Sequence, residues 1–200
     1  MASANLGLYA SNDHLVVRCA QLSDAQPLTD YFVTNASHLK PWEPTREAAF
    51  FELKGWQQRL LKLEELHRLA LGYYCVITDP ADQIVLGTIS FSQLTRFPLH
   101  ACHVGYSLAQ QAQGQYIMTQ ALDLACQWLF KQQNIHRIMA AYMPANTRSE
   151  AVLKRVGFVQ EGIAKDYLLI DGQWQDHILT SLINSEWQAD LSRSVKPIVS

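Results

Sequence analysis

The spacing of apolar residues divides the chain into helical and extended segments. Between about residues 46 and 69, four apolar side chains recur every three to four positions: Trp56, Leu60, Leu63 and Leu66. This spacing predicts a long amphipathic helix. A second helix is expected from Ser23-Asp24, which supply an N-cap and a first-turn acid, to about residue 36. From residue 72 the pattern changes to that of β-strands.

Short runs rich in β-branched and aromatic residues predict the strands. These runs cover residues 14–19, 73–77, 84–91, 103–108, 136–143, 158–161, 164–170 and 173–183. Asp79-Pro80-Ala81-Asp82 is a turn sequence between two of them, and Asp171-Gly172 is a strong hairpin signal between the last two. The pattern indicates a single α/β domain over residues 1–188 and a C-terminal tail over residues 189–200.

Two further helices follow strands and begin at polar or glycine-containing loops. The first follows Gly114 and carries one apolar stripe: Ile117, Met118, Ala121, Leu122, Ala125, Trp128 and Leu129. The second has Asn146 as its N-cap, Gly157 as its stop and an apolar face of Val152, Leu153 and Val156. A strand-to-helix turn with a single glycine is by itself weak evidence for a phosphate site.

Composition and charge exclude several classes of protein. The chain is 48% hydrophobic and 17% charged with a formal net charge of -2, so it lacks the basic surface of a general nucleic-acid-binding protein. Neither a signal-peptide pattern nor an apolar run long enough for a membrane span is present, so a cytoplasmic protein is expected. Its four cysteines predict buried, reduced thiols, and the His100 to His103 spacing argues against a metal site.

Two segments together resemble the acetyl-CoA site of the GNAT N-acetyltransferase family. They are Gln111-Ala-Gln-Gly114-Gln-Tyr116 and the helix from Asn146 to Gly157-Phe158. The resemblance extends from about residue 14 to 187. It is strongest with the RimJ-type ribosomal-protein-alanine N-acetyltransferases, through segments such as Leu39-Lys-Pro-Trp-Glu-Pro44 and Ala164-Lys-Asp-Tyr167. It implies a central, mixed and mostly antiparallel sheet flanked by helices, with acetyl-CoA as cosubstrate and no metal.

The resemblance also assigns residues to the cofactor. Those expected to contact acetyl-CoA are Tyr106, Ser107, Leu108, Gln111, Gln113, Gly114, Gln115, Tyr116, Ile117, Met118 and Asn146. A backbone N-H near Tyr106 to Leu108 would polarise the thioester carbonyl. Tyr116 departs from the family pattern, which has Gly or Ala there. Either its ring points away from the phosphates or the loop binds CoA less well.

The implied reaction is direct transfer of acetyl to the N-terminal alanine of small-subunit ribosomal protein five. The family's tyrosine acid is absent because Leu153 occupies its position, and Ser149, one turn earlier, is the expected proton donor to the thiolate. Glu43, in a loop with prolines on either side of Trp42-Glu43, is the first candidate for the amine-side carboxylate, and a solvated loop glutamate is the alternative interpretation. Glu161, Asp166 and Asp176 are weaker candidates. The aromatic residues Trp42, Tyr167 and Trp174 are either core residues or the lining of a peptide groove.

Other functions are compatible with these motifs. A small-amine acetyltransferase of this fold would enclose its acceptor with acids in the first helical region, where this chain has Glu47, Glu52, Glu64 and Glu65. Helix-surface charges are the simpler interpretation of those residues. A non-catalytic CoA-binding factor for ribosome assembly is a further alternative, with Tyr116 blocking the phosphate loop.

Overall fold

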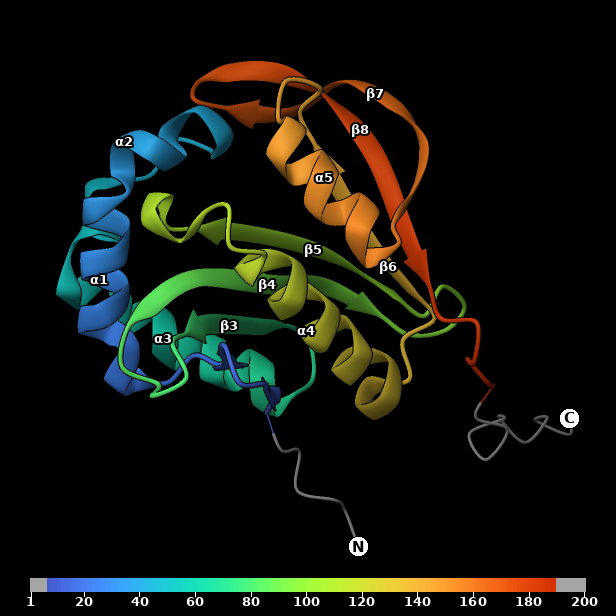
Figure 1. Cartoon of the computed structure of the whole chain (residues 1–200), viewed down its shortest axis with the longest axis horizontal. Helices are drawn as coiled ribbons and strands as arrows, with labels where there is room; N and C mark the ends of the chain where they lie inside the picture. Colours follow the sequence, from blue (N-terminus) through green and yellow to red (C-terminus); the bar gives the residue numbers. More distant parts are fainter. Residues whose placement is uncertain (1–6, 190–200) are drawn as a thin grey trace, which may run out of the picture.

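Eight strands form one continuous sheet across residues 7–189, which are the residues described by the structure, a computed structural model. The strand order is β1-β2-β3-β4-β5-β6-β8-β7, and only β5 and β6 run parallel (Figure 1). The strands are β1 Tyr9–Ser11, β2 Val16–Cys19, β3 Tyr73–Thr78, β4 Val85–Thr95, β5 Ala101–Leu108, β6 Arg137–Tyr142, β7 Val159–Ile170 and β8 Gln173–Ile183. The predicted mixed, mostly antiparallel sheet is confirmed. Apart from Ala189, the expected tail lies outside the described residues.

Helices cover both faces of this sheet. They are α1 Ala25–Thr34, α2 Ala36–Leu39, α3 Leu53–Arg68, α4 Ile117–Gln133 and α5 Thr147–Val156. In Figure 1, α4 and α5 lie in front of the sheet, whereas α1 and α3 pack together at its other side. Cys75, Val76 and Ile77 are consecutive in β3 and all fully buried. Both faces of this strand are therefore covered, as its uninterrupted apolar sequence requires.

The segment before α3 differs from the predicted helix. Helix α3 begins at Leu53, not near residue 46, and Ala48–Phe51 form a separate 3-10 turn. This turn buries Phe50, whose ring lies 4.6 Å from Phe32 and 5.1 Å from Trp56. Burying the Phe50 ring stabilises the fold by more free energy than the helix propensity of a few residues would contribute. The chain therefore forms a separate turn here instead of extending α3 toward residue 46.

Several strand boundaries also differ from the prediction. The two predicted strands over residues 158–161 and 164–170 are one irregular strand, β7, whose ladder with β8 shifts twice. Strand β4 continues to Thr95, and β5 begins two residues early, at Ala101. The short strand β1 was not predicted. Both predicted hairpins, β3–β4 and β7–β8, are confirmed.

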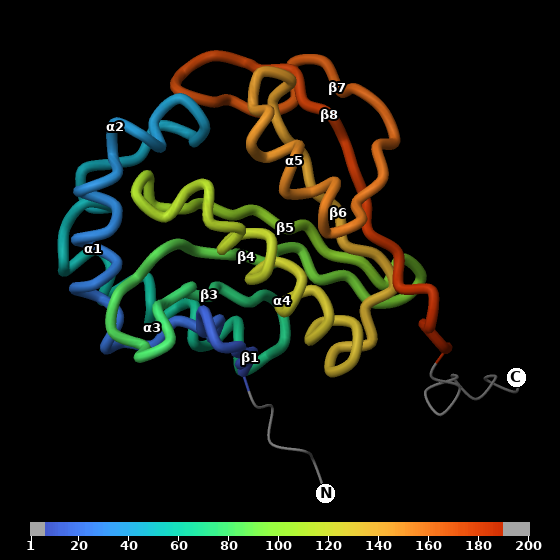
Figure 2. The backbone as a smooth tube through the Cα atoms, in the orientation of Figure 1, coloured from blue at the N-terminus to red at the C-terminus, as the bar shows by residue number. Residues whose placement is uncertain are grey.

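Strands β5 and β6 separate part-way along their length, and this opening positions the site. Their parallel pairing ends at His103 and Met139, although β5 continues to Leu108 and β6 to Tyr142. Figure 2 shows the two backbones diverging beneath α5. The outer half of β5 therefore keeps its partner β4 on one side and has an open edge on the other.

Candidate active site

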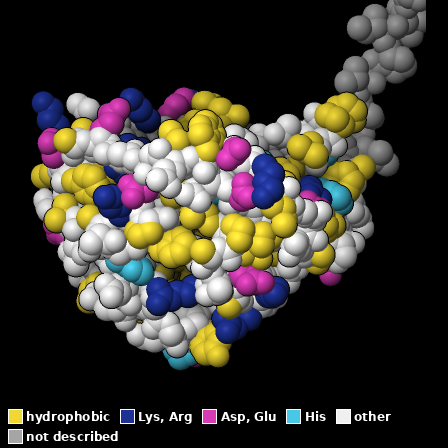
Figure 3. Space-filling model, turned by 90° about the horizontal axis from the view of Figure 1, so that it is seen from above, with side chains coloured by type: hydrophobic (Ala, Val, Ile, Leu, Met, Phe, Trp, Pro, Cys, Tyr) yellow, Lys and Arg dark blue, Asp and Glu magenta, His cyan; other side chains and the backbone are white. Residues whose placement is uncertain are grey.

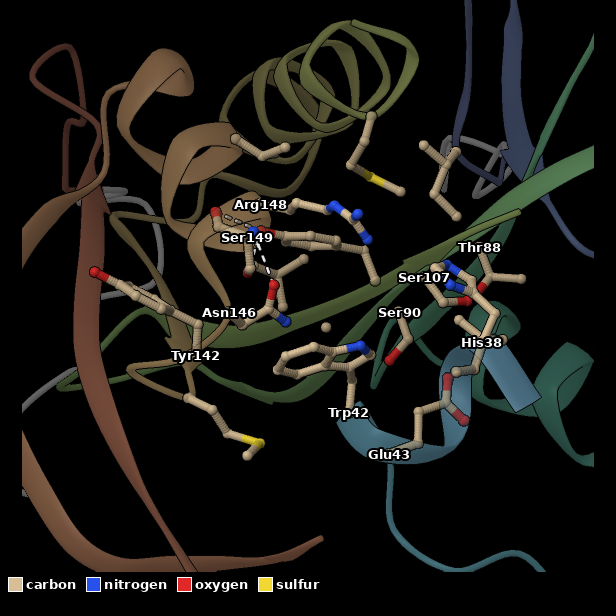
Figure 4. A pocket seen from close by; sticks show the side chains of 18 of the residues that line it. His38, Trp42, Glu43, Thr88, Ser90, Ser107, Tyr142, Asn146, Arg148 and Ser149 are labelled. Atoms are coloured by element: carbon tan, nitrogen blue, oxygen red, sulfur yellow. Dashed lines mark hydrogen bonds between the residues drawn. The ribbon is translucent and has the colours of Figure 1, made fainter. Parts of the chain in front are cut away.

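A cavity of about 1160 Å³ lies at the opening between β5 and β6. It brings together most of the residues predicted from the sequence: Glu43, Tyr106, Ser107, Leu108, Gln113, Gly114, Tyr116, Ile117, Met118, Asn146 and Ser149. Figure 4 shows Asn146 and Ser149 on one side and His38 and Glu43 on another, with the Trp42 ring projecting between them. Gln111 and Gln115 are not part of the lining. The Gln115 side chain instead donates to the Gln111 carbonyl.

The loop before α4 is held by side chains of the preceding helices. Asn35 Oδ1 accepts from the Gln110 N-H at 3.0 Å, and the Gln113 amide lies 3.0 Å from Nε2 of His38. Gly114 has a φ of 76°, and a Cβ at this position would meet no atom within 4 Å. The α4 ladder begins with the Gln120 N-H bonding the Tyr116 carbonyl. The N-H groups that come before Gln120 therefore point out of the N-terminal end of α4, an arrangement suited to binding phosphate oxygens.

Tyr116 adopts the left-handed backbone conformation, with a φ of 58°, at the N-cap of α4. A small residue is preferred there because a Cβ is strained at positive φ. The Tyr116 side chain is 60% exposed, and its ring centroid lies 5.1 Å from the Arg155 guanidinium on α5. The ring therefore packs at the cavity margin against α5.

Hydrogen bonding to β4 decides which backbone groups of β5 face the opening. The Ala109 N-H bonds the Leu86 carbonyl, which fixes the alternation along this antiparallel pair. By that alternation Ser107 directs its backbone groups to β4, whereas Tyr106 and Leu108 direct theirs to the opening. Two of the three residues expected near the thioester thus present an N-H to the cavity.

Helix α5 forms as the sequence predicts. Asn146 Oδ1 accepts from the Ser149 N-H at 3.1 Å, and Gly157 ends the helix at a φ of 101°. Leu153 is buried and Val152 and Val156 pack beside it on the core. Ser149 lies in the first turn, where its hydroxyl faces the cavity. The Oη of Tyr106 lies 2.8 Å from the Ser149 Oγ.

Glu43 lies on the opposite wall of the cavity. It follows the short 3-10 helix Lys40–Trp42, and its carbonyl accepts from the Asp171 N-H at the tip of the β7–β8 hairpin. Its carboxylate receives bonds from Arg46 at 3.2 and 3.3 Å. Burial raises the pKa of the Glu43 carboxyl, and Arg46 offsets this rise only in part. A carboxylate with a raised pKa is a suitable proton acceptor.

The weaker acidic candidates lie outside the cavity, and two of them pair with basic side chains. Glu161 pairs with Arg137 and accepts from the Ser181 hydroxyl. Asp176 faces across the last hairpin, as predicted, and pairs with Lys165 at 2.6 Å. It also accepts from the Asp166 N-H. None of the three residues lines the cavity.

A buried group of hydroxyls beside the cavity was not predicted. The Ser107 Oγ lies 2.9 Å from both the Tyr31 Oη and the Thr88 Oγ1. Burial raises the pKa of Tyr31, and the nearby charge of Glu43 adds to the rise. These residues are far apart in the sequence and follow no motif, so only the folded structure brings them together.

His177 is a second residue that the sequence pattern did not single out. It is 4% exposed, it lines the cavity, and its Nδ1 lies 2.9 Å from the Gln175 carbonyl. A carbonyl only accepts, so Nδ1 carries the proton. Tyr167 packs against this ring, with centroids 5.6 Å apart. Of the three predicted groove aromatics, Trp42 lines the cavity, while Trp174 on the hairpin is 61% exposed.

Other features of the described residues lie outside this cavity. All four cysteines are free thiols, and three of them are buried. Within residues 7–189 no group of three or more His, Cys, Asp or Glu side chains is placed to hold a metal ion. In the same range, no helix has the length and apolar character needed to cross a membrane.

Comparison with known proteins identifies the family. A model of the GNAT acetyltransferase domain matches residues 14–159. The chain belongs to this family. It is 46% identical over 177 residues to the [ribosomal protein uS5]-alanine N-acetyltransferase of Escherichia coli (strain K12), covering 88% of this chain and 91% of that protein. The GNAT domain implied by the two sequence motifs is confirmed, and with it the assignment as an acyltransferase.

Solved structures agree with this membership. The ribosomal-protein-S5-alanine acetyltransferase of Vibrio fischeri superposes on this GNAT acetyltransferase with a TM-score of 0.88 and 50% identity, covering 91% of this chain and 100% of that one. Mycobacterium smegmatis RimJ, in complex with CoA-disulfide, gives a TM-score of 0.79 at 30% identity, covering 84% and 81%.

Proposed function

We propose that this GNAT acetyltransferase moves acetyl from acetyl-CoA to the N-terminal alanine of ribosomal protein uS5. The observation that carries the proposal is one continuous cavity. It places the Gly114 loop, the open edge of β5, Ser149 and Glu43 around a common space. The name and the 46% identity of the E. coli relative support the choice of acceptor.

The acetyl-CoA end of the cavity fits the shape and charge of that cosubstrate. Gly114 leaves open space for close approach, and the N-H groups of Ile117 and Met118 at the start of α4 are suited to the pyrophosphate. The apolar and amide groups at the β5–β6 opening suit the pantetheine arm. Within this arrangement, the backbone N-H of Tyr106 or Leu108 stabilises the negative charge that develops on the carbonyl oxygen.

The acceptor enters from the side of Glu43. An α-amino group has a pKa of about 7.7–8.0, against about 10.4 for lysine, so an N-terminus is partly neutral near physiological pH. Glu43, alone or through water, takes the proton that the nitrogen loses as the C–N bond forms. Because an α-amine needs less help from a base than a lysine side chain does, an α-amine is the favoured acetyl acceptor.

Ser149 acts at the opposite end of the reacting bond. As the C–S bond breaks, its electron pair goes to sulfur, and the Ser149 hydroxyl supplies a proton there. The proton that nitrogen releases balances the one that sulfur gains. A thiol with a pKa near 8.5 is a tolerable leaving group, so a weak hydroxyl acid suffices.

The acceptor chain would leave the cavity past the Lys40–Trp42 segment and the β7–β8 hairpin, which together form one wall. The Glu43–Asp171 backbone bond joins these two elements. Exposed apolar side chains lie on the hairpin, including Leu168, Leu169 and Trp174. Figure 3 shows that hydrophobic side chains on this face are interspersed with acidic and basic ones. Such a surface suits an extended protein N-terminus more than a small, fully enclosed amine.

Mass spectrometry of acetylated peptides tests this function. The purified protein is incubated with acetyl-CoA and two peptides of the uS5 N-terminal sequence, one with a free alanine terminus and one blocked there but carrying lysines. Acetylation of the free terminus alone is the expected result. Transfer to lysine, or no transfer to the free terminus, would contradict the proposal.

A further inference from the structure

The Tyr106 hydroxyl contacts the proposed proton donor directly. Tyr106 lies on β5 and Ser149 on α5, 43 residues later, and both line the cavity. The Tyr106 Oη is 2.8 Å from the Ser149 Oγ and 3.3 Å from the Ser149 carbonyl oxygen. The first turn of α5 is thus tied to the open edge of β5 through one phenol group.

The direction of this hydrogen bond decides whether Ser149 is available for catalysis. Each hydroxyl has one proton. If Tyr106 donates to the Ser149 Oγ, the serine proton remains free for a second acceptor in the cavity. If Ser149 donates to Tyr106 instead, its proton is occupied. A carbonyl oxygen only accepts, so the contact with the Ser149 carbonyl makes Tyr106 the donor on this side, with its proton directed at residue 149, where the Ser149 Oγ is the nearer acceptor.

We propose that Tyr106 is a positioning residue that donates to the Ser149 Oγ and so directs the serine proton toward the departing sulfur. The inference rests on the proposed role of Ser149 in acetyl transfer. Tyr106 itself neither gains nor loses a proton in the net reaction. It fixes the rotation of the hydroxyl that delivers one to sulfur, and Ser149 is reprotonated through solvent from the proton that nitrogen releases.

The surrounding structure fixes the backbone of Ser149 but not its hydroxyl. Asn146 holds the Ser149 N-H at 3.1 Å through its side chain. Rotation about the Cα–Cβ bond and the orientation of the hydroxyl proton need a further contact, and Tyr106 supplies it. Tyr142 is another cavity tyrosine near α5, and Figure 4 shows its ring directed away from Ser149.

A double-mutant cycle on Tyr106 and Ser149 tests the proposal. CoA release is measured in single turnovers at saturating acetyl-CoA for the parent, Tyr106→Phe, Ser149→Ala and the double variant. We expect Ser149→Ala to lower the rate by about 10²-fold and Tyr106→Phe by about tenfold. The double variant should be no slower than Ser149→Ala, with acetyl-CoA affinity unchanged in all of them. Tyr142→Phe serves as the matched loss of a phenol hydroxyl and should keep the parent rate.

Two results of this cycle would overturn the proposal. Multiplicative losses in the double variant would show that Tyr106 acts independently of Ser149 and would overturn the proposal. A parent rate in Ser149→Ala would also overturn it, because no proton donor would be left to position. CoA release can be followed with any amine the parent accepts, so failure with the alanine peptide alone contradicts the choice of acceptor and leaves the test of Tyr106 intact.

Discussion

At the scale of single residues, Tyr116 is the clearest departure from the family pattern. Its φ of 58° costs about 1–2 kcal/mol for a residue with a Cβ. Its ring packs on Arg155, and a Cβ built at Gly114 in the same loop would meet no atom within 4 Å. Of the two alternatives left open by the sequence, a ring turned away from the phosphates is the one that the structure favours.

Substitutions at Tyr116 distinguish two effects of this residue, which are strain in its own backbone and obstruction of the CoA-binding loop by its ring. Tyr116→Gly removes the Cβ and should raise the free energy of unfolding relative to Tyr116→Ala by about 1 kcal/mol, measured by urea denaturation. CoA affinity, measured by calorimetry, should change by less than about fivefold, since only an exposed cation–π contact is lost. A large gain in CoA affinity for the glycine variant would instead show that the ring obstructs the loop.

Glu43 links activity and stability through its raised pKa. A folded-state pKa above the unfolded value of about 4.5 means that the folded protein binds this proton more tightly. The stabilising effect is full below the unfolded pKa and is lost as the pH rises through the folded one. Ionised Glu43 therefore destabilises the fold at neutral pH.

Glu43→Gln should accordingly be more stable than the parent at neutral pH while turning over more slowly. The difference in unfolding free energy should shrink as the pH falls from neutral toward 4.5, because the folded protein takes up this proton at a higher pH than the unfolded chain does. Urea unfolding at both pH values measures it. Lower stability of the variant at neutral pH would mean that the bonds to Arg46 outweigh the cost of burial.

The sequence predicted some of these residues and not others, for a physical reason. Asn146, Ser149 and Gly157 belong to a helix start and stop, which are local signals readable from neighbouring residues. The Tyr106–Ser149 and Tyr31–Ser107 contacts join residues 43 and 76 positions apart. No spacing rule connects such pairs, so tertiary folding alone reveals them.

At the scale of elements, the segment before α3 shows a feature that local helix propensity does not predict. The apolar period correctly placed Trp56 and Leu60 on the buried face, but it did not show that Phe50 also enters the core. Its 3-10 turn crosses α3 so closely that a Cβ on Gly55 would lie 1.7 Å from the Ala49 carbonyl oxygen. Gly55 is therefore required by a close approach that helix periodicity does not encode.

Gly55→Ala should destabilise the protein by about 1–3 kcal/mol, because the turn that carries Phe50 must move. Gly162→Ala is the matched control, since a Cβ there meets nothing within 4 Å and its φ is not positive. Chemical denaturation of both variants measures the difference. Equal stability would show that the turn can shift without disturbing the aromatic core.

At the scale of the whole molecule, the divergence of β5 and β6 makes the site. Both strands and a mixed sheet were predicted, but the parallel pairing of these two strands was not named, and their separation at His103 and Met139 could not be read from the sequence. The resulting cavity is lined by α1, α4 and α5 and by the hairpin β7–β8. A ligand bound there contacts elements from both sides of the sheet.

Acetyl-CoA should therefore stabilise the entire fold and not only the Gly114 loop. At a concentration one hundred times its dissociation constant, a ligand that binds only the folded state adds about 2.7 kcal/mol. Native-state hydrogen exchange should show slower exchange in α1 and β8 as well as in α4. Protection confined to the loop and α4 would contradict a ligand that spans the opening.

In the proposed reaction, acetyl passes through the β5–β6 opening to an α-amine held between Ser149 and Glu43. The most direct measurement is a crystal structure with a bisubstrate ligand, CoA joined through an acetyl linker to the α-nitrogen of an alanine-starting peptide. We expect the linker oxygen at the N-H of Tyr106 or Leu108, the sulfur at Ser149 and the peptide leaving beside Glu43 and the β7–β8 hairpin. A peptide leaving by another route, or a linker remote from Ser149, would contradict the claim.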